Sequence, residues 1–232
     1  MKYILTVISL LFASTAAADC VILVHGLARS SYSFLPMETA LKSIGYDVVN
    51  VGYPSTESTI EELSELAIPP AVAACKNARK MHFVTHSMGG IMVQYYLKHT
   101  AHKPKNLDHV VMLGPPNKGS PIVDRLGDLP GFDLWNGVAG KQMGTGPASL
   151  PNTLGAVDFS LGVIAGSDSI SPIFSSLIDG DDDGKVSIES TKVADMTDHI
   201  VLDVTHTFMM NSPSVFKQVA TFLREGRFRH ED

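Results

Sequence analysis

The sequence has few of the residues that several functional classes need. Two cysteines among 232 residues are too few for a zinc site built mainly from thiolates. Only 18% of residues are charged, and 18 Lys and Arg stand against 24 Asp and Glu, for a formal charge of −6. No run of Lys and Arg is longer than a dipeptide, so the basic face of a nucleic-acid-binding protein is missing. With 44% hydrophobic residues the chain is not of the disordered class.

The first long apolar run stands at the start of the chain. A short basic start precedes an almost unbroken apolar stretch at residues 3–12, and small residues follow, ending in three alanines at 16–18. About ten apolar residues are too few to cross a bilayer, so the pattern predicts a secretory signal peptide over residues 1–18 rather than a membrane anchor. We expect a domain over residues 19–232 that is exported to the periplasm or secreted, without stable membrane insertion.

The two cysteines are expected to form a disulfide. An exported protein folds in an oxidising compartment, where an even number of cysteines favours a disulfide, here between Cys20 and Cys75. The alternative is a pair of buried free thiols.

Short apolar runs alternate with amphipathic segments along the rest of the chain. This order predicts an α/β fold, with a parallel sheet that has helices on both faces and a site at the carboxyl edge of the strands. We expect strands at 21–24, 47–51, 81–85, 109–113, 161–165 and 199–204, and helices at 37–44, 58–67, 71–78 and 89–99 and from residue 213 onward. The prolines at 69–70 are expected to interrupt the second helix.

The segment 115–155 does not fit this alternation. It contains eight glycines, and five prolines follow Pro115, which predicts an irregular, lid-like insertion. An apolar ligand could be covered by Phe132, Leu134 and Trp135. An equally good alternative is that these side chains only pack the insertion against the rest of the domain.

Ser87 is the candidate nucleophile. It lies between a buried strand and a helix, in the run Thr-His-Ser-Met-Gly-Gly that begins at Thr85, so its hydroxyl is expected at the apex of a sharp turn. Such a turn requires small residues two before and two after the serine, and Gly89 meets this requirement while Thr85 is bulkier. The alternative is a serine that only caps the helix.

A second motif, His25-Gly26-Leu27, ends the first strand. An oxyanion needs two aligned donors, and the backbone amides of Leu27 and Met88 are the candidates. His25 is then expected to be a structural, hydrogen-bonded histidine.

The base and its carboxylate are expected near the C-terminus. His206 follows the last predicted strand and is the strongest candidate among nine histidines. The carboxylate should come from the loop after the fifth strand. The candidates by position are Asp168, Asp179, Asp181, Asp182 and Asp183.

With these motifs the chain resembles small secreted bacterial lipases and esterases of the α/β-hydrolase superfamily. The resemblance rests on the motifs at Gly26, Ser87, 114–120 and 183–186 and on His206, in that order. It implies a compact α/β-hydrolase fold of about six strands, an ester or lipid substrate and no cofactor. In such lipases the acid is the Asp of an Asp-Gly-x-Val stretch some two dozen residues before the His. That favours Asp183, which lies 23 residues before His206, over Asp168 and Asp182.

The acidic loop also permits a calcium site. Residues 179–184 match the opening Asp-x-Asp-x-Asp-Gly of a calcium loop, which makes Asp179 and Asp181 weak candidate ligands. The twelfth position is Ser190 rather than a bidentate Glu, so an EF-hand fits poorly and an irregular structural calcium site remains the alternative to a solvated turn.

The sequence therefore predicts a serine hydrolase that cleaves carboxylic esters through Ser87, Asp183 and His206. Two alternatives use the same fold. One is an acyltransferase with the same three residues, and the other is a binding protein without catalysis.

Overall fold

The structure is a computed structural model that describes residues 17–230, except the side chains of residues 133–135. The predicted signal peptide, 1–18, lies outside the described residues apart from its last two positions, as do the side chains of Leu134 and Trp135. Within residues 17–230, none of the helices combines the length and the apolar character needed to cross a bilayer.

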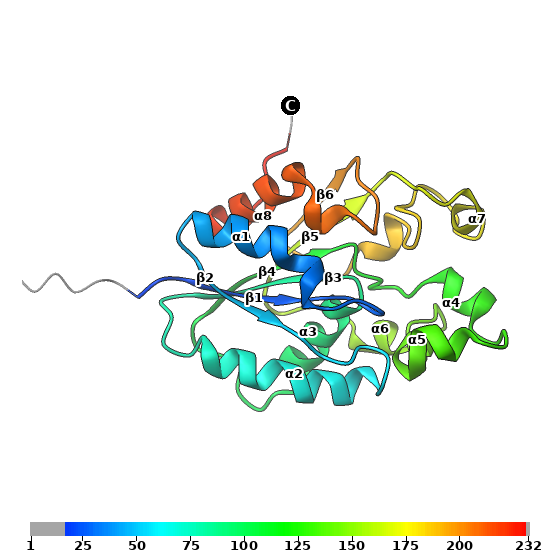
Figure 1. Ribbon diagram of the computed structural model, residues 1–232, viewed down its shortest axis with the longest axis horizontal. Helices are drawn as coiled ribbons and strands as arrows, with labels where there is room; N and C mark the ends of the chain where they lie inside the picture. The colour runs from blue at the N-terminus through cyan, green and yellow to red at the C-terminus, as the bar shows by residue number, and fades with distance from the viewer. Residues whose placement is uncertain (1–16, 231–232) are drawn as a thin grey trace, which may run out of the picture.

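Six parallel strands form the sheet, as predicted (Figure 1). Their order across the sheet is β2-β1-β3-β4-β5-β6. The chain therefore places β2 at one edge beside β1, and then adds β3, β4, β5 and β6 in sequence on the other side of β1. The strands are β1 (Cys20–Val24), β2 (Asp47–Val51), β3 (Met81–His86), β4 (Leu107–Leu113), β5 (Ser160–Gly166) and β6 (Asp198–Leu202). All strand carboxyl ends therefore lie at one edge.

Helices cover both faces of the sheet, as predicted (Figure 1). Side chains alternate along each strand, so Ile22 and Val24 enter one apolar core while Val21 and Leu23 enter the other. The first core is closed by α2 (Ile60–Ala74), α3 (Met88–His99) and α6 (Leu150–Leu154), and the second by α1 (Leu35–Ser43) and α8 (Pro213–Glu225).

The predicted interruption at Pro69-Pro70 is wrong. Helix α2 continues through both prolines to Ala74. The two rings lie on the exposed face, and so do Glu65 and Leu66, whose carbonyls lose their helical donors. Water can satisfy these carbonyls, while the opposite face of the helix remains buried.

The segment 115–155 is more regular than predicted. It contains three short helices, α4 (Pro121–Leu126), α5 (Phe132–Lys141) and α6. Proline stands in the first turn of α4 and α6, where its missing N–H costs nothing, and Gly131 precedes α5 while Gly155 follows α6. The prolines and the flanking glycines therefore delimit helices here, while Gly137, with φ 61° and ψ −169°, breaks α5 into two parts.

A disulfide joins Cys20 in β1 to Cys75 at the end of α2, as predicted. It closes a loop with a sequence separation of 55 residues. In the chain-entropy model a loop of this size stabilises the fold by about 4 kcal/mol.

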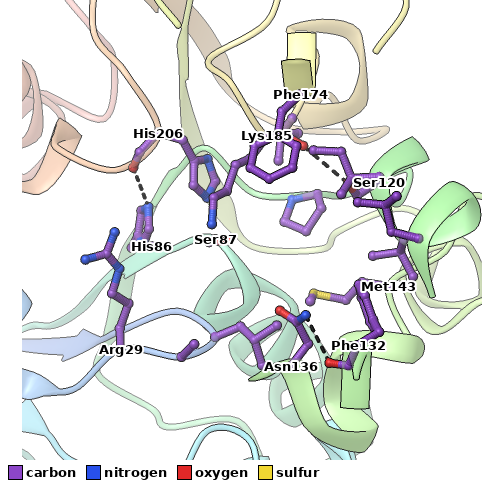
Figure 2. Close-up of a pocket in the computed structure, with 17 residues that line it drawn as sticks. Arg29, His86, Ser87, Ser120, Phe132, Asn136, Met143, Phe174, Lys185 and His206 are labelled. Atoms are coloured by element: carbon purple, nitrogen blue, oxygen red, sulfur yellow. Dashed lines mark hydrogen bonds between the residues drawn. The ribbon is translucent and has the colours of Figure 1, made fainter. Parts of the chain in front are cut away.

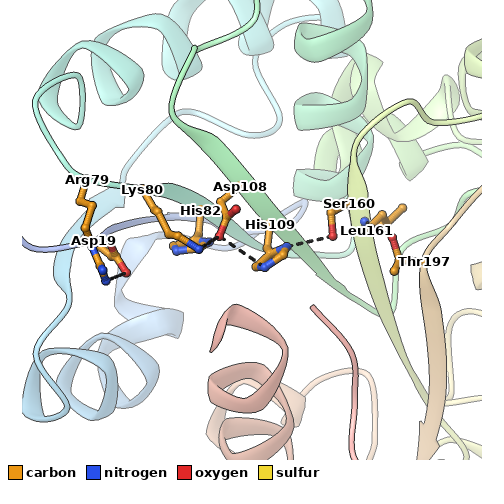
Figure 3. Close-up of polar contacts among 9 residues, drawn as sticks. All are labelled: Asp19, Arg79, Lys80, His82, Asp108, His109, Ser160, Leu161 and Thr197. Atoms are coloured by element: carbon orange, nitrogen blue, oxygen red, sulfur yellow. Dashed lines mark hydrogen bonds and ion pairs between the residues drawn. The ribbon is translucent and has the colours of Figure 1, made fainter. Parts of the chain in front are cut away.

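A polar network lies at the amino-terminal end of the strands, away from the predicted site (Figure 3). Lys80 pairs with Asp108 at 2.8 Å, and His109 lies 3.3 Å from the same carboxylate and bonds Ser160. His82 is fully buried beside them, and neither of its ring nitrogens has a hydrogen-bond partner. Burial lowers the pKa of His82 to about 4. It outweighs the attraction of Asp108, which lies 4.0 Å from Nδ1 and favours the charged ring.

We expect this histidine to make the fold sensitive to acid. The folded-state pKa lies below the unfolded value of 6.5, so the stabilisation is present above pH 6.5 and is lost as the pH falls toward 4. The loss attributable to His82 is about 3 kcal/mol. Urea unfolding of wild type and of His82→Phe from pH 8 to pH 4 measures it, with exposed His102→Phe as control. If His82→Phe loses as much stability as wild type, the assignment is wrong.

Candidate active site

Ser87 lies at a strained turn between β3 and α3. Its backbone has φ 53° and ψ −126°, and residues other than glycine rarely adopt such a positive φ. The turn is held by a 2.9 Å hydrogen bond from the Ser87 amide to the carbonyl of Leu113 in the neighbouring strand. Because Ser87 directly follows β3, its hydroxyl lies at the carboxyl edge of the sheet. The side chain is half-buried and therefore remains accessible.

Glycines allow the turn to fit against its neighbours. A Cβ on Gly89 would stand 2.4 Å from the carbonyl oxygen of Val24 at the end of β1. A Cβ on Gly90 would stand 3.2 Å from Oγ1 of Thr85. Gly89 is therefore small where the turn requires it, as expected, and Gly90 provides space beside the bulkier Thr85.

His206 and Asp183 form a buried pair. Nδ1 of His206 donates to Oδ2 of Asp183 at 2.8 Å, and both residues are buried. The other carboxylate oxygen, Oδ1, accepts the backbone N–H groups of Lys185 and Val186 at 3.0 and 2.8 Å. This pairing places the proton of a neutral His206 on Nδ1 and leaves Nε2 as an acceptor.

The other candidate acids do not contact His206. Asp182 accepts instead from the hydroxyl of Ser175 and the amide of Gly184. Asp168, Asp179 and Asp181 are exposed. Of the five aspartates considered from the sequence, only Asp183 is hydrogen-bonded to the histidine.

His86 supports the His206 loop, a role that the sequence did not indicate. Its Nε2 donates to the backbone carbonyl of His206 at 2.9 Å, and the two ring centroids are 4.7 Å apart. Burial, and next the nearby His206, hold the pKa of His86 well below its usual value. It is therefore neutral and can hold the loop without adding charge. Its place directly before the serine was the only available signal.

A pocket of about 210 Å³ opens above Ser87. Figure 2 shows Ser87, His86 and His206 together on one side of it, across from Met143 and Phe132. Most of the remaining lining is apolar and comes from β1, α4, α7 (Pro172–Ser175) and their loops: Leu27, Ile122, Val123, Leu126, Phe174 and Val186. The pocket thus brings a polar edge and an apolar wall together.

The two predicted oxyanion donors flank the serine. Met88 is the first residue of α3, where the amide has no partner within the helix, and Leu27 lines the pocket. Gly26 packs closely on the turn, since a Cβ there would lie 3.0 Å from Cβ of Ser87. Among the described residues, the amides of Leu27 and Met88 donate to no loop carbonyl and no side chain.

His25 is structural, as predicted. It is fully buried, its Nδ1 bonds the carbonyl of Gly26 at 2.9 Å, and its ring stacks on Tyr53 with centroids 4.1 Å apart. The hydroxyl of Tyr53 donates to the His25 carbonyl at 2.5 Å, which fixes the end of β1 beside the serine turn.

The calcium candidates are not gathered into a site. Asp179 and Asp181 are exposed, and Asp182 is engaged by hydrogen bonds. Over residues 17–230, no group of three or more His, Cys, Asp or Glu is placed to hold a metal ion.

A doubly covered parallel sheet, with a serine at a strained turn between a central strand and the next helix, defines an α/β protein of the hydrolase class. The family model for the alpha/beta hydrolase fold matches residues 19–146. The chain belongs to this family.

Solved structures of lipases and esterases share the fold. The mature form of Bacillus licheniformis lipase BlEst2 has a TM-score of 0.63 at 20% identity, over 93% of each chain. The metagenomic carboxyl esterase MGS0156 gives 0.67 at 20% identity, over 83% of this chain and 65% of that one. Phospholipase PlaB from Legionella pneumophila gives 0.61 at 18% identity, over 75% of this chain.

The lengths of these proteins differ. This chain spans only 46% of PlaB and 52% of the propeptide form of BlEst2. No curated protein matches the sequence. At these identities the structural likeness shows the fold, so the reaction has to be argued from the pocket.

Proposed function

We propose that the protein is a serine hydrolase of carboxylic esters, with Ser87 as nucleophile, His206 as general base and acid, and Asp183 as the carboxylate that orients His206. One observation carries the proposal. The pocket that contains Ser87 also contains His206, and the Nδ1 of His206 donates to the buried Asp183 at 2.8 Å.

In the first half of the reaction, Oγ of Ser87 attacks the ester carbonyl and Nε2 of His206 takes the hydroxyl proton. The carbonyl π electrons move to the oxygen, and the amides of Leu27 and Met88 stabilise the resulting oxyanion. When the carbonyl re-forms, the bond to the alcohol oxygen breaks. His206 gives its proton to that oxygen, which leaves an acyl group on Ser87.

In the second half, His206 removes a proton from water and the hydroxide attacks the acyl carbon. The tetrahedral intermediate expels Ser87, which regains its proton from His206. Asp183 remains ionised and compensates the imidazolium in both halves. The three hydrogen bonds that its two oxygens accept keep the carboxylate in place.

The pocket suggests the class of acyl group. Its wall is apolar, which suits a hydrocarbon chain, and its volume of about 210 Å³ is below the roughly 300–1,000 Å³ of pockets that enclose drug-sized ligands. Esters of short acyl chains, such as p-nitrophenyl butyrate, should therefore be better substrates than palmitate esters.

Export is part of the proposal. The apolar leader over residues 1–18 and the Cys20–Cys75 disulfide both suit a protein that works in the periplasm or outside the cell.

Reaction with a fluorophosphonate tests the proposed function. The purified protein should hydrolyse p-nitrophenyl butyrate, and one equivalent of the reagent should abolish hydrolysis while adding one phosphonyl group. Peptide mass spectrometry should place that group on Ser87. An active protein that resists the reagent, or that carries it on another residue, would contradict the proposal.

Gly114 should be needed for the geometry of the Asp–His pair. It has φ 53°, and a Cβ there would lie 3.0 Å from Oδ2 of Asp183 and 3.1 Å from Nδ1 of His206. Gly114→Ala should therefore lower kcat/KM by roughly 10²-fold, since displacements of about 1 Å in catalytic groups have effects of that size. Gly146→Ala, where a Cβ would meet nothing within 4 Å, is the control. Equal activity of the two variants would show that the pair tolerates the extra methyl group.

A further inference from the structure

Two cations line the pocket beside Ser87. Arg29 follows the Leu27 turn and Lys185 follows Asp183, so the cations come from loops far apart in the sequence. In Figure 2 Arg29 lies on the His86 side of Ser87, and Lys185 lies on the side of Phe174. Among the side chains that the structure describes, no Asp or Glu lines the pocket. Among residues 17–230, no carboxylate forms an ion pair with either cation.

Basic residues elsewhere are of both kinds, since exposed ones such as Lys76 and Arg227 also form no ion pair among residues 17–230, while others do. Several of them are paired with a carboxylate: Lys42 with Glu38, Arg79 with Asp19, Lys80 with Asp108, Lys103 with Asp158, and Lys118 with Glu189. The chain as a whole has a charge of −6. With two cations and no acid among its described lining side chains, the pocket has the opposite sign to the protein as a whole.

The two cations act on each other and on the site. Burial, followed by the charge of Arg29, lowers the pKa of Lys185, although solvent still reaches its side chain. Both cations also contribute to the lowered pKa of His86. Asp183 attracts Lys185, but its carboxylate is buried behind the pocket, bonded to His206 and two backbone amides. A bound anion would relieve the repulsion between Arg29 and Lys185 without displacing any existing partner.

We infer that the pocket selects esters that carry an anionic group, a carboxylate or a phosphate, close to the scissile bond, and that Arg29 and Lys185 bind this group. The inference rests on the proposed ester hydrolysis and names its substrate class. The planar guanidinium of Arg29 can take two oxygens of the anion, and the Lys185 ammonium adds a point charge. The apolar wall receives the hydrocarbon part of the substrate.

Matched substrate pairs test this selection. Mono-p-nitrophenyl succinate and p-nitrophenyl butyrate have the same leaving group and the same number of acyl carbons, and differ by one carboxylate. A second pair, 4-carboxyphenyl butyrate and phenyl butyrate, moves the charge to the alcohol side. A third, short-chain phosphatidylglycerol and the corresponding diacylglycerol, offers a lipid phosphate. The pair with the strongest preference identifies the source of the anion.

The measured quantity is the ratio of kcat/KM for the anionic and the neutral member of each pair, after subtraction of spontaneous hydrolysis. We expect wild type to prefer the anionic member of at least one pair by about tenfold or more. Arg29→Gln/Lys185→Gln should lower that ratio by roughly 10- to 100-fold. The control is Lys76→Gln/Arg227→Gln, which removes the same charge from exposed positions outside the pocket and should leave the ratio unchanged.

The outcomes separate this inference from the proposed function. If hydrolysis depends on Ser87 but no pair shows an anionic preference, or the preference survives in Arg29→Gln/Lys185→Gln, the inference is wrong and the proposed function stands. Calorimetric titration of the Ser87→Ala protein with both members of each pair measures binding without turnover. Tighter binding of the anionic member of at least one pair, lost in Ser87→Ala/Arg29→Gln/Lys185→Gln, supports the inference even where turnover is too slow to measure. Equal binding of the two members in all three pairs overturns it.

Discussion

Ser87→Ala should lower kcat for p-nitrophenyl butyrate by on the order of 10⁴- to 10⁶-fold, because it removes the oxygen that forms the acyl bond in the proposed reaction. The change deletes a hydroxyl that the fold does not use, since the turn is held through the backbone bond from Ser87 to Leu113. The positive φ of 53° at this position costs an alanine about as much strain energy as it costs a serine. The melting temperature should therefore stay within a few degrees of wild type, with rates followed by nitrophenolate absorbance.

Ser120→Ala is the matched control for this variant. Ser120 also lines the pocket, but its hydroxyl donates to the Lys185 carbonyl at 3.2 Å and lies outside the proposed triad. Its loss should change kcat by less than about tenfold, the effect of one weak hydrogen bond. If Ser87→Ala retains more than a tenth of wild-type activity, Ser87 is not the nucleophile.

Asp183→Asn should lower kcat by about 10⁴-fold. The amide has the size of the carboxylate, and its oxygen can still accept the N–H groups of Lys185 and Val186. Its NH₂ group would then face Nδ1 of His206, which can no longer donate. The imidazole proton moves to Nε2, so the ring cannot accept the proton of Ser87, and the imidazolium has no counter-charge.

Asp182→Asn, one residue away, separates this effect from a general disturbance of the loop. Asp182 is also buried, but it bonds Ser175 and Gly184 and does not contact His206. The asparagine oxygen can keep both acceptor bonds, so kcat should stay within about tenfold of wild type. Comparable losses in the two variants would mean that loop stability, rather than the orientation of His206, sets the rate.

The sheet was predictable because its signal is local. Each strand contains a short apolar run, and a strand buried on both faces, such as Cys20–Val24, is a continuous hydrophobic segment. The path of α2 through Pro69-Pro70 was not predictable in this way. It depends on whether the freed carbonyls face water, which is a property of how the helix packs on the sheet. The helices within 115–155 were missed for a similar reason, since proline and glycine both start and stop helices.

The site was predictable in part. Ser87 could be placed from the order strand, serine, helix, and His206 from its position after the last strand. Asp183 could not be separated from Asp182 by position alone, because the choice depends on which side chain points toward the histidine, and only the family spacing favoured it. Arg29 and Lys185 gave no signal in the sequence. Their significance comes from the pocket they share, which has no carboxylate among its described lining side chains, and which residues line a pocket depends on the tertiary structure.

Trapping of the acyl-enzyme shows whether Ser87 is the nucleophile. When the protein is mixed with p-nitrophenyl butyrate and quenched in acid within the first turnover, we expect a burst of nitrophenolate of up to one equivalent. Intact mass should rise by one butyryl group, and peptide analysis should locate that group on Ser87, with no adduct on Ser87→Ala. Nitrophenolate release by wild type with the butyryl group on another residue, or equally fast release by Ser87→Ala, would show that Ser87 is not the nucleophile.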